Sequence, residues 1–307
     1  MRIIKETHIN FMGKTGVAAI FSAVLILVGV GSMITKGGPK LSIDFKGGTQ
    51  VAVNYTEPVD ITEVRSALSN VVIDGRDFDF SNAEIKHFGN ESDVVVRLPI
   101  IEDEPEQFTH KFVEKMAGAF PTLVPDNESE FILSIVKLWP KIGAELSGDA
   151  IMAIISTLIL ILIYISIRFE FRYAVGAIAA LTHDVLITLG IFSLLNLEVS
   201  LAVIAAFLTI VGYSLNDTIV IFDRIRENVK GAKNTTLSSV INEGINQSLS
   251  RTIITSLTTF FVVLILYLVG GEVIHTFAFA MIVGVIIGTY SSIFIASPVL
   301  IKMDSDS

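Results

Sequence analysis

The sequence predicts a polytopic α-helical membrane protein of six transmembrane helices, with an extracytoplasmic α+β domain of ferredoxin-like topology between the first and second helices. Of its 307 residues, 51% are hydrophobic and 17% are charged, and the mean hydropathy is +0.67, which is far from the composition of soluble proteins. Six apolar runs are long enough to cross a bilayer. The chain has no cysteine, which excludes disulfides, thiolate metal sites and a cysteine nucleophile.

The predicted segments follow one another along the chain. They are a cytoplasmic N-terminus at 1–15, a first span at 16–36, an outside domain at 37–148, spans at 149–168, 173–195 and 200–222, a cytoplasmic loop with an amphipathic helix at 223–251, spans at 252–270 and 275–301, and a cytoplasmic tail at 302–307. The first span follows Arg2, Lys5 and Lys14 like the core of a signal sequence, but no small-residue cleavage pattern follows it. We therefore expect a retained anchor.

Lysine and arginine in the short loops predict the orientation. The N-terminus and the loops after the second and fourth spans are basic, whereas the short loops 196–200 and 270–275 contain no lysine or arginine. Because positively charged short loops stay on the cytoplasmic side, we expect a multi-pass plasma-membrane protein with both termini in the cytoplasm.

The segment between the first two spans has the pattern of a compact soluble domain. The predicted elements are strands at 41–45 and 49–55 around a Gly47-Gly48 turn, a helix at 61–72, a hairpin of 84–88 and 93–99, a helix at 104–120 and a strand at 131–138. The order β(β)-α-β-β-α-β is that of a ferredoxin-like module.

This outside domain carries nineteen acidic and ten basic side chains, which argues against a nucleic-acid partner. A solvated surface is the simpler interpretation of the acidic excess, and an acidic docking face is the alternative. His87 and His110 lack metal-ligand spacing and no GxSxG is present, so we expect no enzymatic activity, no metal and no cofactor.

Three ionisable residues in the predicted spans are candidate functional residues, because each such group costs on the order of 3 kcal/mol at the centre of a membrane helix, and an arginine at the border of a span is a fourth candidate. His183 and Asp184 lie in the third span and Asp217 in the fourth. Arg251 precedes the fifth span, where a border arginine that only sets topology is the alternative.

Polar residues also form stripes on two of these helices. Thr209, Gly212 and Asn216 share one side of the fourth span, and Arg251, Thr255 and Thr258 share one side of the fifth. Polar stripes avoid lipid, so they must face each other, a cavity or another chain.

Asp217 is predicted to change its protonation state during function. A dry helix interface favours the neutral acid, whereas a nearby Arg251 guanidinium favours the carboxylate, so relative movement of the two would load and unload a proton. The alternative is an Asn216/Asp217 hydrogen-bond clamp between helices. For His183 and Asp184, a proton relay and a helix clamp both stay open.

The loop 223–251 carries apolar residues at helical spacing from Leu237 to Leu249. We expect a helix that lies on the membrane lipids, and coupling to a cytoplasmic partner is the alternative.

Several motifs give the chain a resemblance to a known family. They are IDFKGGTQ at 43–50, WPKIGAEL at 139–146, RFEFRYAVGAI at 168–178, HDVLITLGIFSL at 183–194, GYSLNDTIVIFDRIREN at 212–228 and SRTIITSLTT at 250–259. On these the chain resembles the SecF family of the SecDF accessory complex, within the resistance-nodulation-division superfamily. Trp139 stands where the family commonly has glycine, and Phe171 where it often has tryptophan.

The resemblance implies a partner SecD, a SecY-type channel and preprotein substrates drawn outward by the proton gradient. It places the family's membrane aspartate at Asp217, its arginine at Arg251 and its glycine motif at Asp44, Gly47 and Gly48, and it implies neither cofactor nor metal. Four points stay open. They are the stage of export that is assisted, whether the coupling ion is the proton or sodium, whether SecA is present in the host, and the stoichiometry of the complex.

Three rival functions are considered. An intramembrane aspartyl protease would use Asp184 and Asp217 as a dyad that shares a proton, although no GxGD-type motif surrounds either residue. A small-molecule exporter of the same superfamily would normally be a longer chain with both six-helix halves. An inert scaffold for SecD would tolerate loss of Asp217.

Overall fold

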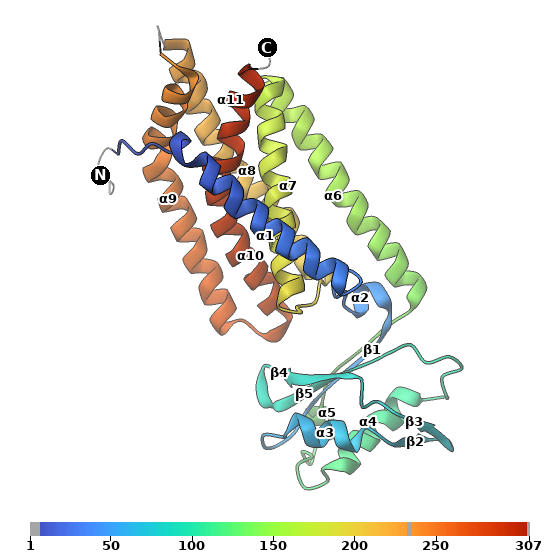
Figure 1. The fold of residues 1–307 in the computed structure, drawn as a ribbon. Coiled ribbons are helices and arrows are strands. Elements are labelled where there is room, and N and C mark those ends of the chain that lie inside the picture. Colours follow the sequence, from blue (N-terminus) through green and yellow to red (C-terminus); the bar gives the residue numbers. More distant parts are fainter. Residues whose placement is uncertain (1–6, 232–234, 306–307) are drawn as a thin grey trace. The chain divides into compact units, whose positions relative to one another are not determined.

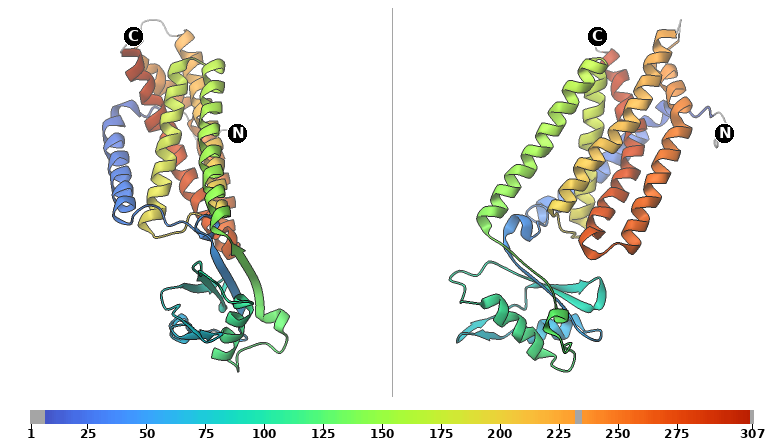
Figure 2. Two further views of the ribbon diagram at one scale, coloured as in Figure 1. Left: turned by 90° about the vertical axis from the view of Figure 1, so that its right-hand side faces the viewer. Right: turned by 180° about the vertical axis from the view of Figure 1, so that it is seen from behind.

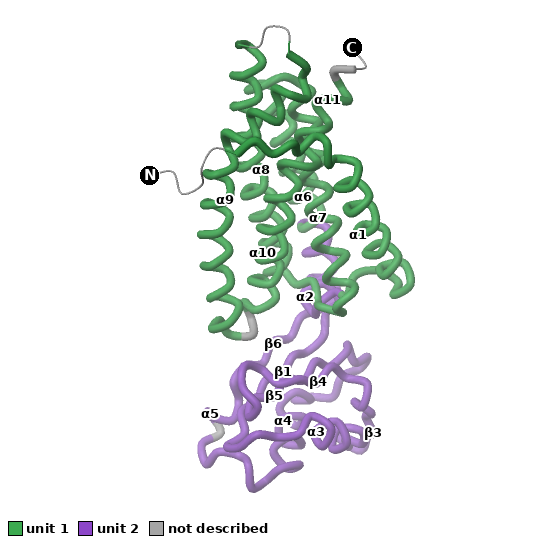
Figure 3. Tube along the Cα trace, turned by 60° about the vertical axis from the view of Figure 1, so that its left-hand side comes forward, with its two compact units in different colours: residues 1–40, 150–307 green, residues 41–149 purple. Residues whose placement is uncertain are grey.

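The computed structural model describes residues 7–231 and 235–305. The chain divides into two compact units, one formed by Met1–Lys40 with Ala150–Ser307 and the other by Leu41–Asp149 (Figure 3). The first unit is helical and the second contains the β-sheets.

The helical unit contains the six predicted spans. Its elements are a 3₁₀ turn η1 (Met12–Lys14), α1 (Thr15–Thr35), most of α6 (Pro140–Arg168), α7 (Phe171–Leu194), α8 (Leu201–Gly231), α9 (Leu237–Val269), α10 (Glu272–Ser291), a π-helical segment η2 (Ser292–Ala296) and α11 (Ser297–Ser305). Among the described residues, six helices are long and apolar enough to cross a membrane, the last of them running through α10, η2 and α11. The predicted number of spans is thus confirmed.

The six helices are buried to different degrees. Helices α7, α8 and α10 have the largest buried shares, whereas most of the apolar surface of α1, α6 and α9 is exposed. In Figures 1 and 2, α7, α8 and α10 lie side by side in the bundle. Helices α7, α8 and α10 therefore have the largest share of side chains removed from lipid, and α7 and α8 carry His183, Asp184 and Asp217, the buried ionisable residues predicted from the sequence.

Glycines allow two pairs of these helices to approach closely. A Cβ atom on Gly29 of α1 would lie 2.7 Å from the Cα of Gly190 on α7, so the backbones touch at this crossing. On α10, a Cβ on Gly284 would meet Ile210 of α8 at 2.3 Å, and one on Gly288 would meet Ser214 at 3.0 Å. Small residues are what permits such close packing of membrane helices.

The predicted surface helix in the loop 223–251 is wrong as a separate element. Helix α8 continues to Gly231, and the residues from Leu237 onward are the first turns of α9. Val240, Ile241 and Ile245 are buried, and Gly244 packs against Ile225 of α8. The apolar side of these first turns of α9 is therefore covered by α8 and neighbouring helices and does not lie on membrane lipids.

The start of the described chain is attached to the same part of α9. Asn242 accepts a hydrogen bond from the Met12 N–H at 3.0 Å, and Asn246 accepts one from the Ile9 N–H at 2.9 Å. The Asn246 amide also donates to the Ile9 carbonyl at 2.9 Å. Two asparagine side chains thus satisfy backbone groups at and before the start of η1, and they attach the entry of α1 to α9.

The second unit has a four-stranded antiparallel sheet in the order β4-β5-β1-β6. Its elements are α2 (Ile43–Lys46), β1 (Gly48–Asn54), α3 (Ile61–Ala67), β2 (Val71–Ile73), β3 (Arg76–Phe78), β4 (Glu84–Phe88), β5 (Asn90–Leu98), α4 (Phe108–Ala119), α5 (Glu128–Phe131), β6 (Ile132–Leu138) and the start of α6. Strands β1, β4, β5 and β6 with helices α3 and α4 make the predicted β-α-β-β-α-β order. Tyr55, Phe108 and Phe112 are among the fully buried side chains of its core.

Two local predictions for this unit are wrong. The segment 41–45 is not a strand, because the Ser42 hydroxyl caps helix α2 by accepting the Asp44 N–H. The predicted helix 61–72 ends at Ala67, and a hairpin of β2 and β3 follows. Its turn is Asp74-Gly75, with φ of 54° and 74°, a dipeptide that favours tight hairpins.

Candidate functional site

Asp217 lies on the side of α8 that faces α9, and its side chain is 3% exposed. Its carboxylate accepts hydrogen bonds from Thr255 Oγ1 at 3.4 Å and Ser256 Oγ at 3.2 Å, both on α9. Ser256 Oγ also lies 2.7 Å from Thr289 Oγ1 on α10. Hydroxyl groups from two helices therefore surround a carboxylate in the seam between α8, α9 and α10.

Arg251 lies on α9 one turn before Thr255, and its side chain is exposed. Within the described part of the chain, no hydrogen bond or ion pair joins its guanidinium to the Asp217 carboxylate, which bonds to Thr255 and Ser256. In this arrangement Asp217 is held by neutral donors alone.

The structure does not bring Asn216 into this seam. Asn216 is exposed on the outer side of α8, together with Thr209 and Gly212 of the predicted stripe. Arg251 and Thr258 are exposed on α9. These five residues are called the outer polar stripe below.

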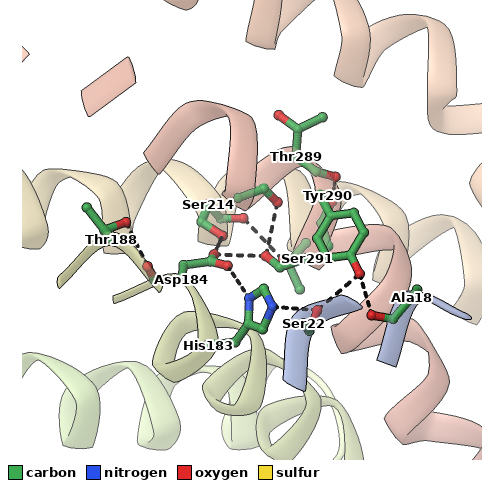
Figure 4. Close-up of polar contacts among 12 residues, drawn as sticks. Ala18, Ser22, His183, Asp184, Thr188, Ser214, Thr289, Tyr290 and Ser291 are labelled. Atoms are coloured by element: carbon green, nitrogen blue, oxygen red, sulfur yellow. Dashed lines mark hydrogen bonds and ion pairs between the residues drawn. The ribbon is translucent and has the colours of Figure 1, made fainter. Parts of the chain in front are cut away.

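His183 and Asp184 belong to a second buried cluster, shown in Figure 4. Asp184 is fully buried, and one of its oxygens, Oδ2, accepts hydrogen bonds from Ser214 of α8 at 2.6 Å and Ser291 of α10 at 2.8 Å. Its other oxygen, Oδ1, lies 2.9 Å from His183 Nδ1. The carboxylate therefore links α7 to both α8 and α10.

The opposite side of the His183 ring faces α1 (Figure 4). His183 Nε2 lies 2.9 Å from Ser22 Oγ, which lies 3.0 Å from the hydroxyl of Tyr290. Tyr290 donates to the Ala18 carbonyl at 2.8 Å. One continuous chain of polar contacts thus joins α1, α7, α8 and α10.

The two clusters meet along α8 and α10 but do not merge. Ser214 and Asp217 are three residues apart on α8, and Thr289 and Ser291 are two apart on α10. Each carboxylate has its own hydroxyl donors, and among the described residues no hydrogen bond connects Asp184 with Asp217. A dyad that shares one proton requires such a contact.

Sequence reasoning missed four members of the second cluster, namely Ser22, Ser214, Tyr290 and Ser291. A signal was available for Ser214, which lies one turn before Asp217, and for Ser291, which follows Gly288 by three residues. Nothing in the sequence pairs Ser22 with His183, because the two residues are 161 positions apart and lie on different helices.

The glycine motif occupies a tight site in the second unit. Gly47 has φ +74° and ends α2, and a Cβ there would lie 3.0 Å from the Leu138 carbonyl. Gly48 has φ +131°, and its Cβ would lie 2.6 Å from the Leu98 carbonyl. Asp44 lies in α2, whose last carbonyls approach Gly143 of α6 so closely that a Cβ on Gly143 would lie 2.5 Å from the Phe45 carbonyl. Gly47, Gly48 and Gly143 therefore allow α2 and the start of α6 to pack closely against each other and the sheet.

The described residues contain no group of three histidine, aspartate or glutamate side chains that could hold a metal ion. The buried ionisable groups of the helical unit are instead surrounded by hydroxyl groups. Hydroxyls can both donate and accept hydrogen bonds, so they can stabilise a carboxyl group in its neutral or its charged form.

Comparisons with known proteins agree with this architecture. Residues 124–306 match the family model of the protein export membrane protein SecD/SecF, C-terminal, and residues 31–59 match the SecD/SecF GG motif. The chain is 44% identical to the protein translocase subunit SecF of Calditerrivibrio nitroreducens, over 97% of this chain and 95% of that protein. It is also 44% identical to SecF of Rhodothermus marinus, over 99% and 96%.

Solved structures of SecDF resemble it as well. The structure of SecDF from Thermus thermophilus, described as a translocon-associated membrane protein, superposes with a TM-score of 0.82 at 37% identity and covers 98% of this chain. A SecDF structure in a super-membrane-facing form gives 0.70 at 36% identity over 100% of this chain. The chain spans about two fifths of those proteins, 39% and 40% of their lengths. Its sequence, its six spanning helices and its glycine motif together place it in the SecD/SecF family of protein export membrane proteins.

Proposed function

We propose that the chain is the SecF subunit of a SecDF-type complex, and that it assists protein export by using the proton-motive force through Asp217. It acts as a transport subunit and not as an enzyme. The observation that carries the proposal is the carboxylate of Asp217, which is buried in a helix seam among hydroxyl donors, one of them from Thr255, one turn after Arg251 on α9.

This geometry supports two states of Asp217. When the carboxyl group is protonated it is neutral, and the hydroxyls of Thr255 and Ser256 satisfy it. When it loses the proton, a buried negative charge requires a cationic partner, and Arg251 reaches it by a shift of α9 relative to α8. Proton binding and release thus favour different positions of α9.

The membrane potential supplies enough energy for such a switch. One elementary charge that crosses a potential of about 100 mV releases ~2.3 kcal/mol. This is sufficient to change the ratio of two conformations by more than tenfold.

A SecD-like partner accounts for the outer polar stripe. Polar and charged groups in a membrane helix avoid lipid, and the five stripe residues are exposed on the isolated chain. The solved SecDF chains are more than twice as long as this one, so a second chain is expected to supply the remaining half and to cover the stripe. A SecY-type channel and preprotein segments are the further partners on the outer side.

The basic short loops support a plasma-membrane location with both termini in the cytoplasm. The Leu41–Asp149 unit is then extracytoplasmic, and the first turns of α9 extend into the cytoplasm. The acidic surface of the Leu41–Asp149 unit favours a solvent-exposed position and argues against a nucleic-acid partner.

The test is Asp217→Asn in the native complex, with Asp223→Asn as the matched control, because Asp223 lies further along α8 and its carboxylate pairs with Arg168 and Arg226, outside the seam. Export from inverted or right-side-out vesicles is measured with and without a proton gradient. We expect gradient-dependent export to be lost in Asp217→Asn and kept in Asp223→Asn, while both variants still co-purify with a SecD-like chain.

Gradient-dependent export at the normal rate in Asp217→Asn overturns the proposed mechanism. A sodium gradient applied to the unchanged protein distinguishes the two ions. A protease function is not favoured, because Asp184 and Asp217 make separate sets of contacts.

A further inference from the structure

The contacts around His183 determine where the protons of its cluster lie. Tyr290 has one hydroxyl proton, and the Ala18 carbonyl can only accept, so Tyr290 donates there. The contact between Ser22 and Tyr290 must then use the Ser22 proton. Ser22 has no second proton to donate, so the contact between Ser22 and His183 requires a proton on Nε2 of the histidine.

A second proton lies on the other side of the imidazole ring. Asp184 Oδ2 accepts from Ser214 and Ser291, and the 2.9 Å contact between Oδ1 and His183 Nδ1 requires a proton on one of these two atoms. The histidine and the aspartate together therefore hold two protons. A neutral imidazole beside an ionised carboxylate would hold only one.

We propose that His183 and Asp184 form a second proton-binding site, in which the pair jointly holds one exchangeable proton as long as Ser22 and Tyr290 keep their present contacts. The loaded pair has no net charge, either as imidazolium with carboxylate or as imidazole with carboxylic acid. That neutrality is what allows Asp184 to be fully buried.

Release of the proton is coupled to α1. When Ser22 moves away and water enters, the Nε2–H bond breaks and the proton passes to a water molecule, leaving a neutral imidazole protonated on Nδ1 and an ionised Asp184. The remaining negative charge is unfavourable in a dry bundle, so loading favours the closed contact and release favours an open, hydrated one.

Few other ionisable groups face the pair from the helices packed against it. Helix α1 has none between Thr15 and Thr35, η2 has none, and α10 contributes Tyr290. On α8 the nearest are Tyr213 and Asp217, and Asp217 bonds to α9 instead. The charge of the pair is therefore governed by the cluster of Figure 4.

The role assigned to this second proton rests on the proposed function, but the site itself does not. The pair contacts α8 and α10 through Ser214 and Ser291, and Asp217, itself on α8, is linked to Thr289 of α10 through Ser256 of α9. A change of protonation at either site thus shifts the same two helices.

The experiment counts protons on the pair in the full-length chain reconstituted in lipid nanodiscs. Ring ¹⁵N signals of labelled histidine and ¹³C carboxyl signals of labelled aspartate are recorded from pH 5 to 9, and His183 is assigned with His183→Gln. We expect Nε2 protonated at pH 7, with a second proton on Nδ1 or on Asp184. An unprotonated Nε2 beside an ionised Asp184 at pH 7 overturns the proposal.

Tyr290→Phe tests the cause, and Tyr164→Phe is the matched control because Tyr164 is 55% exposed on α6. Without the Tyr290 oxygen, Ser22 can donate its proton to Nε2, so we expect about a tenfold loss in the proton affinity of the pair. The control should match the unchanged chain. An unchanged proton count across the pH range in Tyr290→Phe also overturns the proposal.

Asp217→Asn separates the two proposals, since its effect on export tests Asp217 whereas the His183 signals test the pair. Normal export in Asp217→Asn together with a loaded pair removes the Asp217 mechanism and leaves the second site. Loss of export together with an unprotonated Nε2 keeps the Asp217 mechanism and removes the second site.

Discussion

Ser214 and Asp217 lie one turn apart on helix α8, yet they bond in two different directions. Ser214 donates to Asp184 of α7, whereas Asp217 accepts from Thr255 and Ser256 of α9. A single turn of α8 therefore separates the sites of two buried carboxyl groups, those of Asp184 and Asp217. A small rotation of α8 would change both sets of hydrogen bonds together.

Ser256→Ala is expected to weaken the Asp217 site. The substitution removes one of two hydroxyl donors to the carboxylate and the contact with Thr289, and an unsatisfied buried polar group costs about 1–3 kcal/mol. We expect a several-fold lower rate of gradient-dependent export with assembly retained. Ser239→Ala, an exposed serine in the first turn of the same helix, is the control, and equal rates in the two variants would contradict the role of Ser256.

Gly29→Ala is expected to separate α1 from α7. The added methyl group would lie 2.7 Å from the Gly190 Cα, a clash with backbone that typically costs about 1–3 kcal/mol in a packed interior. The thermal unfolding midpoint of the purified chain should fall. Gly31→Ala, two residues along the same helix, meets no atom within 4 Å and should leave the midpoint unchanged.

Gly48→Ala is expected to destabilise the Leu41–Asp149 unit. Its φ of +131° disfavours any side chain, and its Cβ would lie 2.6 Å from the Leu98 carbonyl, for a combined cost of at least ~1–3 kcal/mol. Hydrogen exchange at strands β1 and β5 should accelerate. In Gly118→Ala, where α4 leaves open space, exchange should stay the same or slow, and faster exchange there would argue against this steric cause.

Tyr55 is expected to make the same unit sensitive to alkaline pH. Burial raises the pKa of its phenol above the ordinary value of about 10, because ionisation would leave a charge in the core. Its contribution to stability is therefore complete below the unfolded-state pKa and is lost as pH rises toward the raised value.

The measurement is denaturant unfolding at pH 8 and pH 11, followed by fluorescence of Trp139, the single tryptophan. At pH 8, Tyr55→Phe should be less stable than the unchanged chain by about 1 kcal/mol, because the hydrogen bond to the Met116 carbonyl is lost. At pH 11 the difference should shrink or reverse. A constant difference would show that Tyr55 ionises normally.

Patterns in the sequence predict the architecture well. Apolar run length gave the six spans, and the return to soluble composition after the first span gave the sheet-containing unit. The location of Asp217 in a helix seam was also predictable, because a carboxylate in an apolar run must face protein. Periodicity alone could not show that residues 237–250 continue into α9, since a surface helix and a buried helix end have the same apolar pattern.

The composition of the two polar clusters was less predictable. Hydroxyl groups are common in membrane helices, and only the tertiary packing selects Ser22, Ser214 and Ser291 from the others. Asn216 is a polar residue that the sequence assigns to the Asp217 site and the structure does not. Its polarity and its position beside Asp217 suggest a shared site, but the 100° step between neighbouring helical residues turns its side chain to the exposed side of α8.

The length of α9 has a mechanical consequence. As one uninterrupted helix from Leu237 to Val269, it would act as a lever in any tilt about Ser256, because Leu237 lies about 29 Å from that residue at a rise of ~1.5 Å per residue. A tilt of about 10° at the carboxylate then displaces the far end by roughly 5 Å. Asn242 and Asn246 travel on that arm and hold the backbone of Ile9 and Met12, so a sub-nanometre event at one proton-binding group would be transmitted as a pull on the first helix of the chain.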